Sequence, residues 1–233
     1  MAGVSTALAR VWNAGLDMVF PPRCVSCKEF GAYICPACRP LMMRADAPRC
    51  RVCWTPEAGG ACETCRYRRP VFDGARSALV FDGPAREAVH ALKFRGLTAI
   101  ARTMAVPMAE RLIEWDPPAA AIMPVPLAGS RKRSRGYNQS ELLAREIARL
   151  TGLPLVTGVL TRRGSTPPQV GQPDWEARRD NVARAFATRG QVPGGILLVD
   201  DVMTTGATLD ACARVLLGSG SGPVFALTFA RED

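Results

Sequence analysis

The segment Ile196 to Thr208 constrains the fold more than any other part of the sequence. Its first residues, 196–199, are a run of apolar and mostly branched side chains, the pattern of a strand buried on both faces. Two aspartates follow directly, and then a turn of small and hydroxyl-bearing residues: Thr204, Thr205, Gly206, Ala207 and Thr208. The apolar periodicity of 207–217 predicts a helix after the turn. We therefore expect a strand that ends in Asp200 and Asp201 and leads through a tight turn into a helix.

This arrangement predicts an anion site beside a site for hydroxyl groups. The first backbone N–H groups of a helix have no partner within the helix, and the helix dipole favours an anion there. In open α/β sheets, ligands lie beyond the carboxyl ends of the strands. We therefore expect the turn to hold a phosphate, and Asp200 and Asp201 to hold a polyhydroxyl group. The alternative is an ordinary strand end of an α/β protein.

A second candidate anion site follows the apolar segment 120–125, which predicts another buried strand. A short basic turn comes after it, with cations at Arg131, Lys132, Arg133 and Arg135. Guanidinium groups bind phosphate oxygens in pairs, so a basic turn just beyond a strand end suits a pyrophosphate. A solvated basic loop or a patch for nucleic acid is the alternative.

The polar, proline-bearing segment 162–174 predicts a loop that could close over a site. We extend this candidate as far as Arg179, and a passive surface loop is the alternative. Its residues of interest are Arg162, Arg163, Thr166, Gln169, Arg178, Arg179 and, just beyond it, Asn181.

Cysteine spacing gives the second strong signal. Eight of the nine cysteines form four Cys-x-x-Cys pairs: Cys24 and Cys27, Cys35 and Cys38, Cys50 and Cys53, Cys62 and Cys65. A two-residue gap lets both sulfurs of a pair bind one ion at about 2.3 Å, so eight ligands suffice for two structural Cys₄ Zn²⁺ sites. Consecutive pairs could share an ion, or the pairs could alternate in a cross-braced arrangement. Disulfides are the alternative to zinc. The ninth, Cys212, is expected to be a small buried hydrophobe.

The remaining composition narrows the classes of function. A single histidine, His90, excludes most Ser/His and Cys/His nucleophile schemes, and its apolar surroundings favour a structural role. The formal net charge of +9 falls to about +5 when eight thiolates and two Zn²⁺ ions are included. This balance favours anionic partners, and a polyphosphate accounts for part of it without nucleic acid.

Alternating periodicity predicts an α/β fold with a mainly parallel sheet and helices on both faces. The expected strands are 77–81, 120–125, 155–160, 196–199 and 224–229, and the expected helices are 84–94, 97–115, 138–150 and 207–217. We divide the chain into an N-terminal amphipathic helix, a cysteine module and an α/β domain, with bounds 1–23, 24–70 and 71–233.

No apolar run reaches the length of a membrane-spanning helix, so we expect no transmembrane segment. Arg10 and Asp17 interrupt the apolar N-terminal stretch, which therefore fits an amphipathic helix better than a signal peptide. We expect a cytoplasmic protein.

Two resemblances add to this interpretation. The segment from Asp200 to Thr208 resembles the signature of type I phosphoribosyltransferases, enzymes that bind 5-phosphoribosyl-1-pyrophosphate (PRPP). From Cys24 to Arg231 the chain resembles the ComF family of competence-associated proteins. This likeness rests on the cysteine pairs and, in order, on 90–96 (HALKFRG), 124–126 (PVP), 135–139 (RGYNQ), Gln169 with Arg178 and Asn181, and 198–208. One departure is Gln172-Pro173, where a Leu-containing turn is expected.

The resemblance implies a type I phosphoribosyltransferase fold preceded by a double zinc ribbon. It implies that Asp200 and Asp201 bind the ribose and act in catalysis, and that the turn 204–208 binds the 5′-phosphate. Arg131, Arg135 and Lys93 would then hold the pyrophosphate. Mg²⁺ would bind together with PRPP, since it prefers oxygen ligands. Transfer of the phosphoribosyl group is a further implied activity, and its acceptor is not implied.

For the ComF family, the resemblance also implies a role in DNA uptake during natural competence, beside a helicase-like partner. The main alternative is a single-stranded DNA-binding competence factor whose phosphoribosyl pocket is regulatory or vestigial. Aromatic residues make up only 6% of the chain, which leaves few stacking platforms for such a role. A redox protein that uses Cys-x-x-Cys is a third alternative, disfavoured by the four pairs.

Overall fold

The computed structural model describes residues 21–162 and 185–233. All but the last three residues of the predicted N-terminal segment 1–23 lie outside this range, as does most of the candidate closing loop, including Arg163, Thr166, Gln169, Arg178, Arg179 and Asn181. The division of the chain into three parts stays a prediction.

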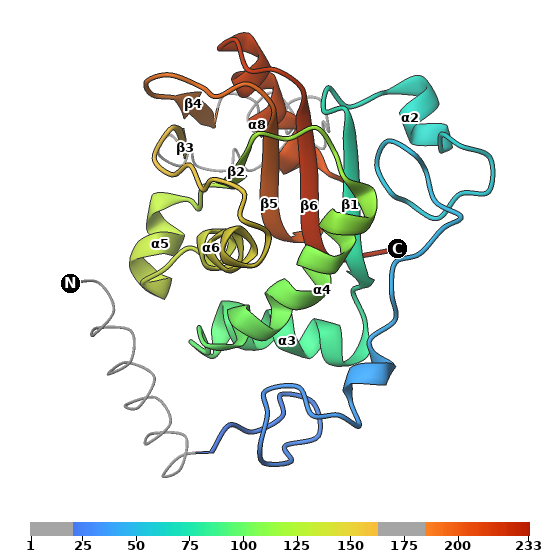
Figure 1. The fold of residues 1–233 in the computed structure, drawn as a ribbon, viewed down its shortest axis with the longest axis vertical. Helices are drawn as coiled ribbons and strands as arrows, with labels where there is room; N and C mark the ends of the chain where they lie inside the picture. Colours follow the sequence, from blue (N-terminus) through green and yellow to red (C-terminus); the bar gives the residue numbers. More distant parts are fainter. Residues whose placement is uncertain (1–20, 163–184) are drawn as a thin grey trace, which may run out of the picture.

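A four-stranded parallel sheet forms the centre of the described structure (Figure 1). Its strands lie in the order β1 (Gly74–Val80), β6 (Val224–Arg231), β5 (Ile196–Met203) and β2 (Ala121–Pro124). Pairing is parallel throughout, so all four strands end at the same edge of the sheet. Every residue of β6 is buried, as expected for a central strand covered on both faces.

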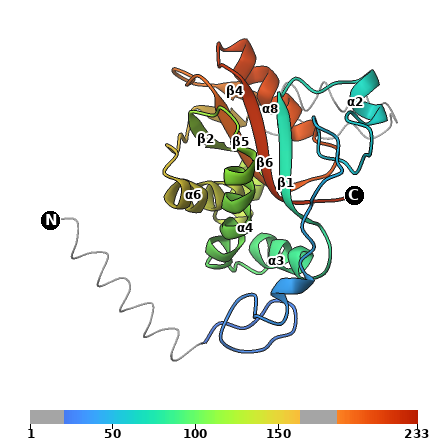
Figure 2. The ribbon, with the colours of Figure 1, turned by 45° about the vertical axis from the view of Figure 1, so that its right-hand side comes forward.

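Helices cover both faces of this sheet, as the edge-on view in Figure 2 shows. Three helices pack on one face, namely α3 (Gly83–Phe94), α4 (Ile100–Trp115) and α6 (Gln139–Thr151). The helix α8 (Ala207–Gly218) packs on the other face. Side chains of β5 alternate between the two cores, because successive residues of a strand point to opposite faces. The predicted fold class, a mainly parallel α/β sheet behind a cysteine module, is confirmed.

The cysteine module has little regular structure, apart from η1 (Arg39–Leu41) and α2 (Glu63–Tyr67). Its two halves pack into different cores. Cys24, Val25 and Ile34 join the core of α3 and α4, whereas Cys50 and Val52 join the core of α8. The module therefore clasps the sheet from both faces.

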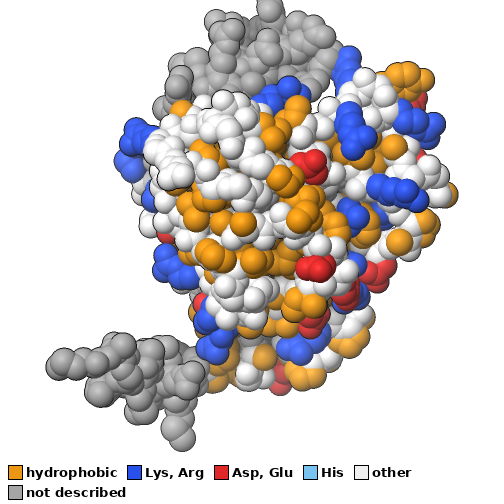
Figure 3. Space-filling view, turned by 45° about the horizontal axis from the view of Figure 1, so that its top comes forward, with side chains coloured by type: hydrophobic (Ala, Val, Ile, Leu, Met, Phe, Trp, Pro, Cys, Tyr) orange, Lys and Arg blue, Asp and Glu red, His pale blue; other side chains and the backbone are white. Residues whose placement is uncertain are grey.

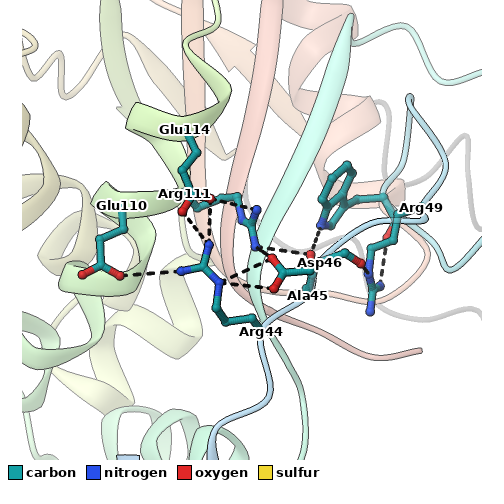
Figure 4. A network of polar contacts seen from close by, with 8 residues as sticks. Arg44, Ala45, Asp46, Arg49, Glu110, Arg111 and Glu114 are labelled. Carbon is teal, nitrogen blue, oxygen red and sulfur yellow. Dashed lines mark hydrogen bonds and ion pairs between the residues drawn. The ribbon is translucent and has the colours of Figure 1, made fainter. Parts of the chain in front are cut away.

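A polar network joins the two halves of the module to α4 (Figure 4). Arg44 donates two hydrogen bonds to the Glu114 carboxylate, at 2.6 and 2.7 Å, and Arg111 donates a third at 3.0 Å. Arg111 also pairs with Asp46, and the Trp54 indole donates to the Ala45 carbonyl at 2.7 Å. These contacts fix the path of the chain between the two four-cysteine groups.

Two predictions of local structure are wrong. The basic segment after β2 is not a turn but a short helix, α5 (Gly129–Arg135), with no buried residue. The segment 155–160 is not a strand of the main sheet. Only an isolated bridge joins Leu155 to Ile122, and the strand β3 (Leu160–Arg162) pairs antiparallel with β4 (Phe186–Thr188) in a separate small sheet.

Candidate functional site

The acidic pair lies at the carboxyl edge of the sheet, near the end of β5. The hydroxyl of Ser140, in the first turn of α6, donates to Asp200 Oδ1 at 2.7 Å, and the Asp201 backbone N–H donates to the same oxygen at 2.9 Å. Burial and the neighbouring Asp201 charge raise the pKa of Asp200 to about 7, against the opposing effect of these hydrogen bonds and Lys93. Asp200 is thus held in a fixed orientation at the edge of solvent.

Asp201 is the more buried of the two, with 4% of its side chain exposed. Its Oδ1 accepts an ion pair from Lys93 Nζ at 2.8 Å. Its Oδ2 is buried and has no hydrogen-bond partner among the described residues. A buried carboxylate oxygen without a donor is costly, so this atom suits a hydroxyl group supplied by a ligand.

The turn after β5 has the geometry expected of an anion cradle. Gly206 precedes α8 with a φ of +77°, and a Cβ at this position would lie 2.8 Å from Met203 Cε. Glycine is therefore required both by the backbone angle and by the close approach. Thr204 and Thr205 are exposed, and α8 starts at Ala207, so its first N–H groups face the turn. A small cavity of about 60 Å³ is formed by residues 202–209 and Asp200.

A larger cavity of about 570 Å³ adjoins the turn. It brings together Lys93, Arg131, Arg135, Asp200, Asp201, Thr204 and Thr208, while Thr205, Gly206 and Ala207 line the small cavity. The two cavities share Asp200, Thr204 and Thr208. Acidic, basic and phosphate-binding candidates that are far apart in the sequence therefore face one space, with room for a sugar beside the carboxylates.

Three further side chains of this cavity were not assigned a role from the sequence. Ser140 holds Asp200, Phe94 follows Lys93 at the end of α3, and Arg162 reaches the cavity from β3. Burial and the nearby Arg131 charge lower the pKa of Arg162. Its position before the candidate closing loop was the one signal in the sequence. Ser140 and Phe94 border recognised motifs, but only packing reveals where they point.

The eight paired cysteines form two groups in chain order, one of Cys24, Cys27, Cys35 and Cys38 and one of Cys50, Cys53, Cys62 and Cys65. Consecutive pairs therefore combine, and a cross-braced arrangement is excluded. Within each group all four sulfurs lie within 4.8 Å of one another, and no disulfide joins any of the nine cysteines. A tetrahedral Zn²⁺ at about 2.3 Å from each sulfur sets them about 3.8 Å apart. Both groups are consistent with zinc.

One cysteine in each group is prepared for the thiolate form. Burial opposes ionisation of Cys24, but the backbone N–H groups of Cys35, Cys27 and Ser26 outweigh it and lower the pKa to about 6. Cys50 has the equivalent environment, and its pKa is also about 6. Thiolates are the form that binds metal, so the backbone of each half suits a cation. Cys212, by contrast, is fully buried in the core of α8.

Fold and site together define a class: a parallel α/β protein with an acidic pair and an anion-binding turn at its carboxyl edge, clasped by a double four-cysteine module. The double zinc ribbon domain family matches residues 15–68. The DNA utilization protein YhgH of Salmonella typhimurium is 32% identical over 200 residues, which span 82% of this chain and 87% of the relative. The chain belongs to the ComF family.

Two further relatives carry competence names. Competence protein F of Haemophilus influenzae is 32% identical over 165 residues, covering 66% of this chain and 71% of the relative. Competence protein ComFC of Bacillus subtilis is 28% identical over 197 residues, covering 80% and 79%. The family is therefore one of competence and DNA utilization proteins.

Solved structures with a similar fold include two phosphoribosyltransferases. A hypoxanthine phosphoribosyltransferase from Staphylococcus aureus has a TM-score of 0.35 and 10% identity, over 56% of this chain and 62% of that one. A purine phosphoribosyltransferase from Pyrococcus horikoshii has a TM-score of 0.33 and 15% identity, over 55% and 80%. At such scores these likenesses carry no conclusion about the chemistry of the site.

Within residues 21–162 and 185–233, none of the helices combines the length and the hydropathy needed to cross a membrane.

Proposed function

We propose that the carboxyl-edge cavity binds PRPP together with Mg²⁺. The observation that carries this proposal is the convergence of an acidic pair, an anion-binding turn and three cations on one space of about 570 Å³. A phosphorylated sugar with a second anionic group offers hydroxyls, a phosphate and a pyrophosphate to these three sets. The signature shared with type I phosphoribosyltransferases supports the same assignment.

Each set of residues has a distinct role in this proposal. Asp200 and Asp201 accept hydrogen bonds from the ribose hydroxyls, and the free Oδ2 of Asp201 is one such acceptor. Residues 204–208 hold the 5′-phosphate with backbone N–H groups and threonine hydroxyls. Arg131, Arg135 and Lys93 hold the pyrophosphate as cations, with Lys93 also neutralising Asp201.

Mg²⁺ neutralises the pyrophosphate and bridges its oxygens to the ribose, which is the chemistry that this ion supplies when bound. The protein's own groups stabilise the charges that develop during transfer. As the bond from ribose C1 to the pyrophosphate oxygen breaks, positive charge grows on the ring and negative charge on the leaving group. The acidic pair lies next to the first charge and the three cations lie next to the second.

A comparison of two ligands tests the proposal. Wild-type protein is titrated with PRPP and with ribose 5-phosphate, both with Mg²⁺, in a calorimeter. We expect PRPP to bind at least tenfold more tightly, because only PRPP reaches the cations. In Arg131→Ala/Arg135→Ala the two affinities should become similar while ribose 5-phosphate keeps its own. Lys132→Ala/Arg133→Ala is the matched control, since these α5 residues do not line the cavity. Failure of both ligands to bind the wild type contradicts the proposal.

Transfer is tested separately. Purified protein is incubated with PRPP, Mg²⁺ and a panel of bases, and pyrophosphate release is measured. A base that increases the release identifies the acceptor. No increase above the base-free rate with any of them would favour a pocket that binds PRPP for regulation.

The family places these activities in the handling of DNA, and we propose a cytoplasmic protein that acts beside a helicase-like partner. The clustered free thiols fit a reducing compartment. Direct binding of single-stranded DNA is the alternative. On the face seen in Figure 3, Lys and Arg side chains are spread out instead of forming one stripe. Salt-sensitive DNA binding that survives Asp200→Asn/Asp201→Asn would favour this alternative.

A further inference from the structure

The larger cavity contains an aromatic side chain that the contacts to ribose, phosphate and pyrophosphate leave unused. Phe94 is the last residue of α3 and is the only aromatic residue among the described residues that line the cavity. It is 71% exposed. It lines the larger cavity and not the small one at the phosphate turn, so it lies away from the proposed phosphate end.

The structure holds this ring in place from several sides. Lys93, the preceding residue, is fixed by its ion pair with Asp201. The Tyr137 hydroxyl donates to the Leu92 carbonyl and so ties the end of α3 to the segment before α6. His90, one helical turn earlier, meets Phe94 edge to face at 5.7 Å between ring centroids. An aromatic ring that is already positioned loses little conformational freedom when a ligand binds.

A cation faces the same ring. The guanidinium carbon of Arg135 lies 5.7 Å from the Phe94 centroid, and its Nη1 donates to Gln139 at 2.5 Å. Arg135 and Phe94 thus come from two elements, α5 and α3, and meet across the cavity. Aromatic rings and guanidinium planes are the two kinds of side-chain surface on which flat heterocycles stack.

We propose that Phe94 is the platform on which a planar nitrogen heterocycle stacks, with Arg135 beside it. This heterocycle is the group joined to ribose C1 in the nucleotide form of the bound ligand. The inference rests on the proposed phosphoribosyl site and adds the class of acceptor: a nucleobase-like ring, not an aliphatic amine or a carboxylate. Phe94 therefore determines specificity, because it contacts the ring and none of the atoms of ribose 5-phosphate.

The test separates the ring from the sugar phosphate. Wild type, Phe94→Ala and Phe94→Trp are titrated with ribose 5-phosphate and with AMP, GMP, UMP and CMP. We expect at least one nucleotide to bind the wild type more tightly than ribose 5-phosphate does. Phe94→Ala should lower the affinity for that nucleotide about tenfold and change the affinity for ribose 5-phosphate less than twofold. Phe94→Trp should retain the nucleotide affinity.

Phe30→Ala is the matched control. Phe30 is also an exposed phenylalanine, at 53%, with an arginine over its face, since Arg23 lies 4.1 Å from its centroid, but it is not among the residues that line the cavity. This variant should change neither affinity. If wild type binds ribose 5-phosphate but no nucleotide more tightly, or if Phe94→Ala weakens all ligands equally, the platform is overturned and the phosphoribosyl site stands. If ribose 5-phosphate itself fails to bind, both are overturned.

Discussion

Asp200 and Asp201 are adjacent in sequence but lie in different electrostatic environments. Asp201 is compensated by Lys93 at 2.8 Å, whereas Asp200 has the Ser140 hydroxyl and a backbone N–H as its donors. The protein therefore neutralises one carboxylate with a full charge and supports the other with dipoles alone. This asymmetry gives the pair different responses to pH, and it gives the turn beside them a fixed position.

The first prediction concerns the pH dependence of stability. The pKa of Asp200 is about 7 in the folded protein and near 3.8 in the unfolded chain. Between these values the folded state keeps a proton that the unfolded state has released. The stabilising contribution is therefore fully present below pH 3.8 and is lost as pH rises through 7.

Asp200→Asn removes this titration, so the unfolding free energy of wild type relative to the variant should fall as pH rises from 5 to 8. Urea unfolding at several pH values measures the difference, and the zinc ligands, common to both proteins, cancel. A difference that stays constant over this range contradicts the assignment.

The second prediction concerns Gly206. Alanine here keeps a φ of +77° and brings its Cβ to 2.8 Å from Met203 Cε, so the turn must shift. We expect Gly206→Ala to lose about 2 kcal/mol of stability and at least tenfold in affinity for ribose 5-phosphate. Gly152→Ala is the control, because Gly152 has the same φ of +77° with nothing within 4 Å. It should lose about 1 kcal/mol and no affinity. Equal effects on affinity would show that the turn does not hold the phosphate.

At the scale of elements, the second four-cysteine group is joined to the strand and helix that carry the phosphate turn. Asp210, in the first turn of α8, accepts a hydrogen bond from the Val71 backbone at 2.7 Å. Phe72 packs beside Gly206. Arg231, at the end of β6, donates to the Cys53 carbonyl at 2.6 Å. The first group packs instead against α3 and α4.

The third prediction follows from this difference. Cys62→Ser and Cys35→Ser should each reduce the zinc content, measured by elemental analysis, from two ions per chain to one. Only Cys62→Ser should weaken the binding of ribose 5-phosphate, by at least fivefold, because only the second group contacts the neighbours of the turn. Equal losses of affinity in the two variants would contradict this coupling. An unchanged zinc content would contradict the metal assignment itself.

The elements also show what the sequence could and could not predict. The carboxyl-edge cluster was predictable, because β5 has a clear buried pattern and parallel strands end at one edge. The helix α5 was missed because all its side chains are exposed, which leaves no apolar periodicity, although its lysine and arginines are good helix formers. Leu155 and β3 were misassigned because short apolar runs carry no information about their partners. Ser140 and Phe94 depend on how α6 and α3 pack, which local patterns do not encode.

At the scale of the whole molecule, the cysteine module and the sheet share their cores. Cys24, Val25 and Ile34 are buried with the helices of one face, and Cys50 and Val52 with those of the other. The network of Arg44, Arg111 and Glu114 adds polar contacts between them (Figure 4). Neither part has a separate interior, although the two parts are distinct in sequence.

The fourth prediction is therefore a single cooperative unfolding transition for the metal-loaded protein. Scanning calorimetry should give one peak, with equal calorimetric and van't Hoff enthalpies. A chain that begins at Val71 loses core contacts on both faces and should not show this transition. Two separate peaks in the full-length protein, one of them unchanged in the shortened chain, would show that the parts fold independently.

The most direct measurement is a calorimetric titration of PRPP and Mg²⁺ into wild-type protein and into Asp200→Asn/Asp201→Asn. The substitutions keep the size of both side chains and remove the charges that face the proposed ribose. We predict saturable binding of one PRPP per chain to the wild type and at least a hundredfold weaker binding to the variant. Equal affinity in the two proteins, or no binding to the wild type, would contradict the account.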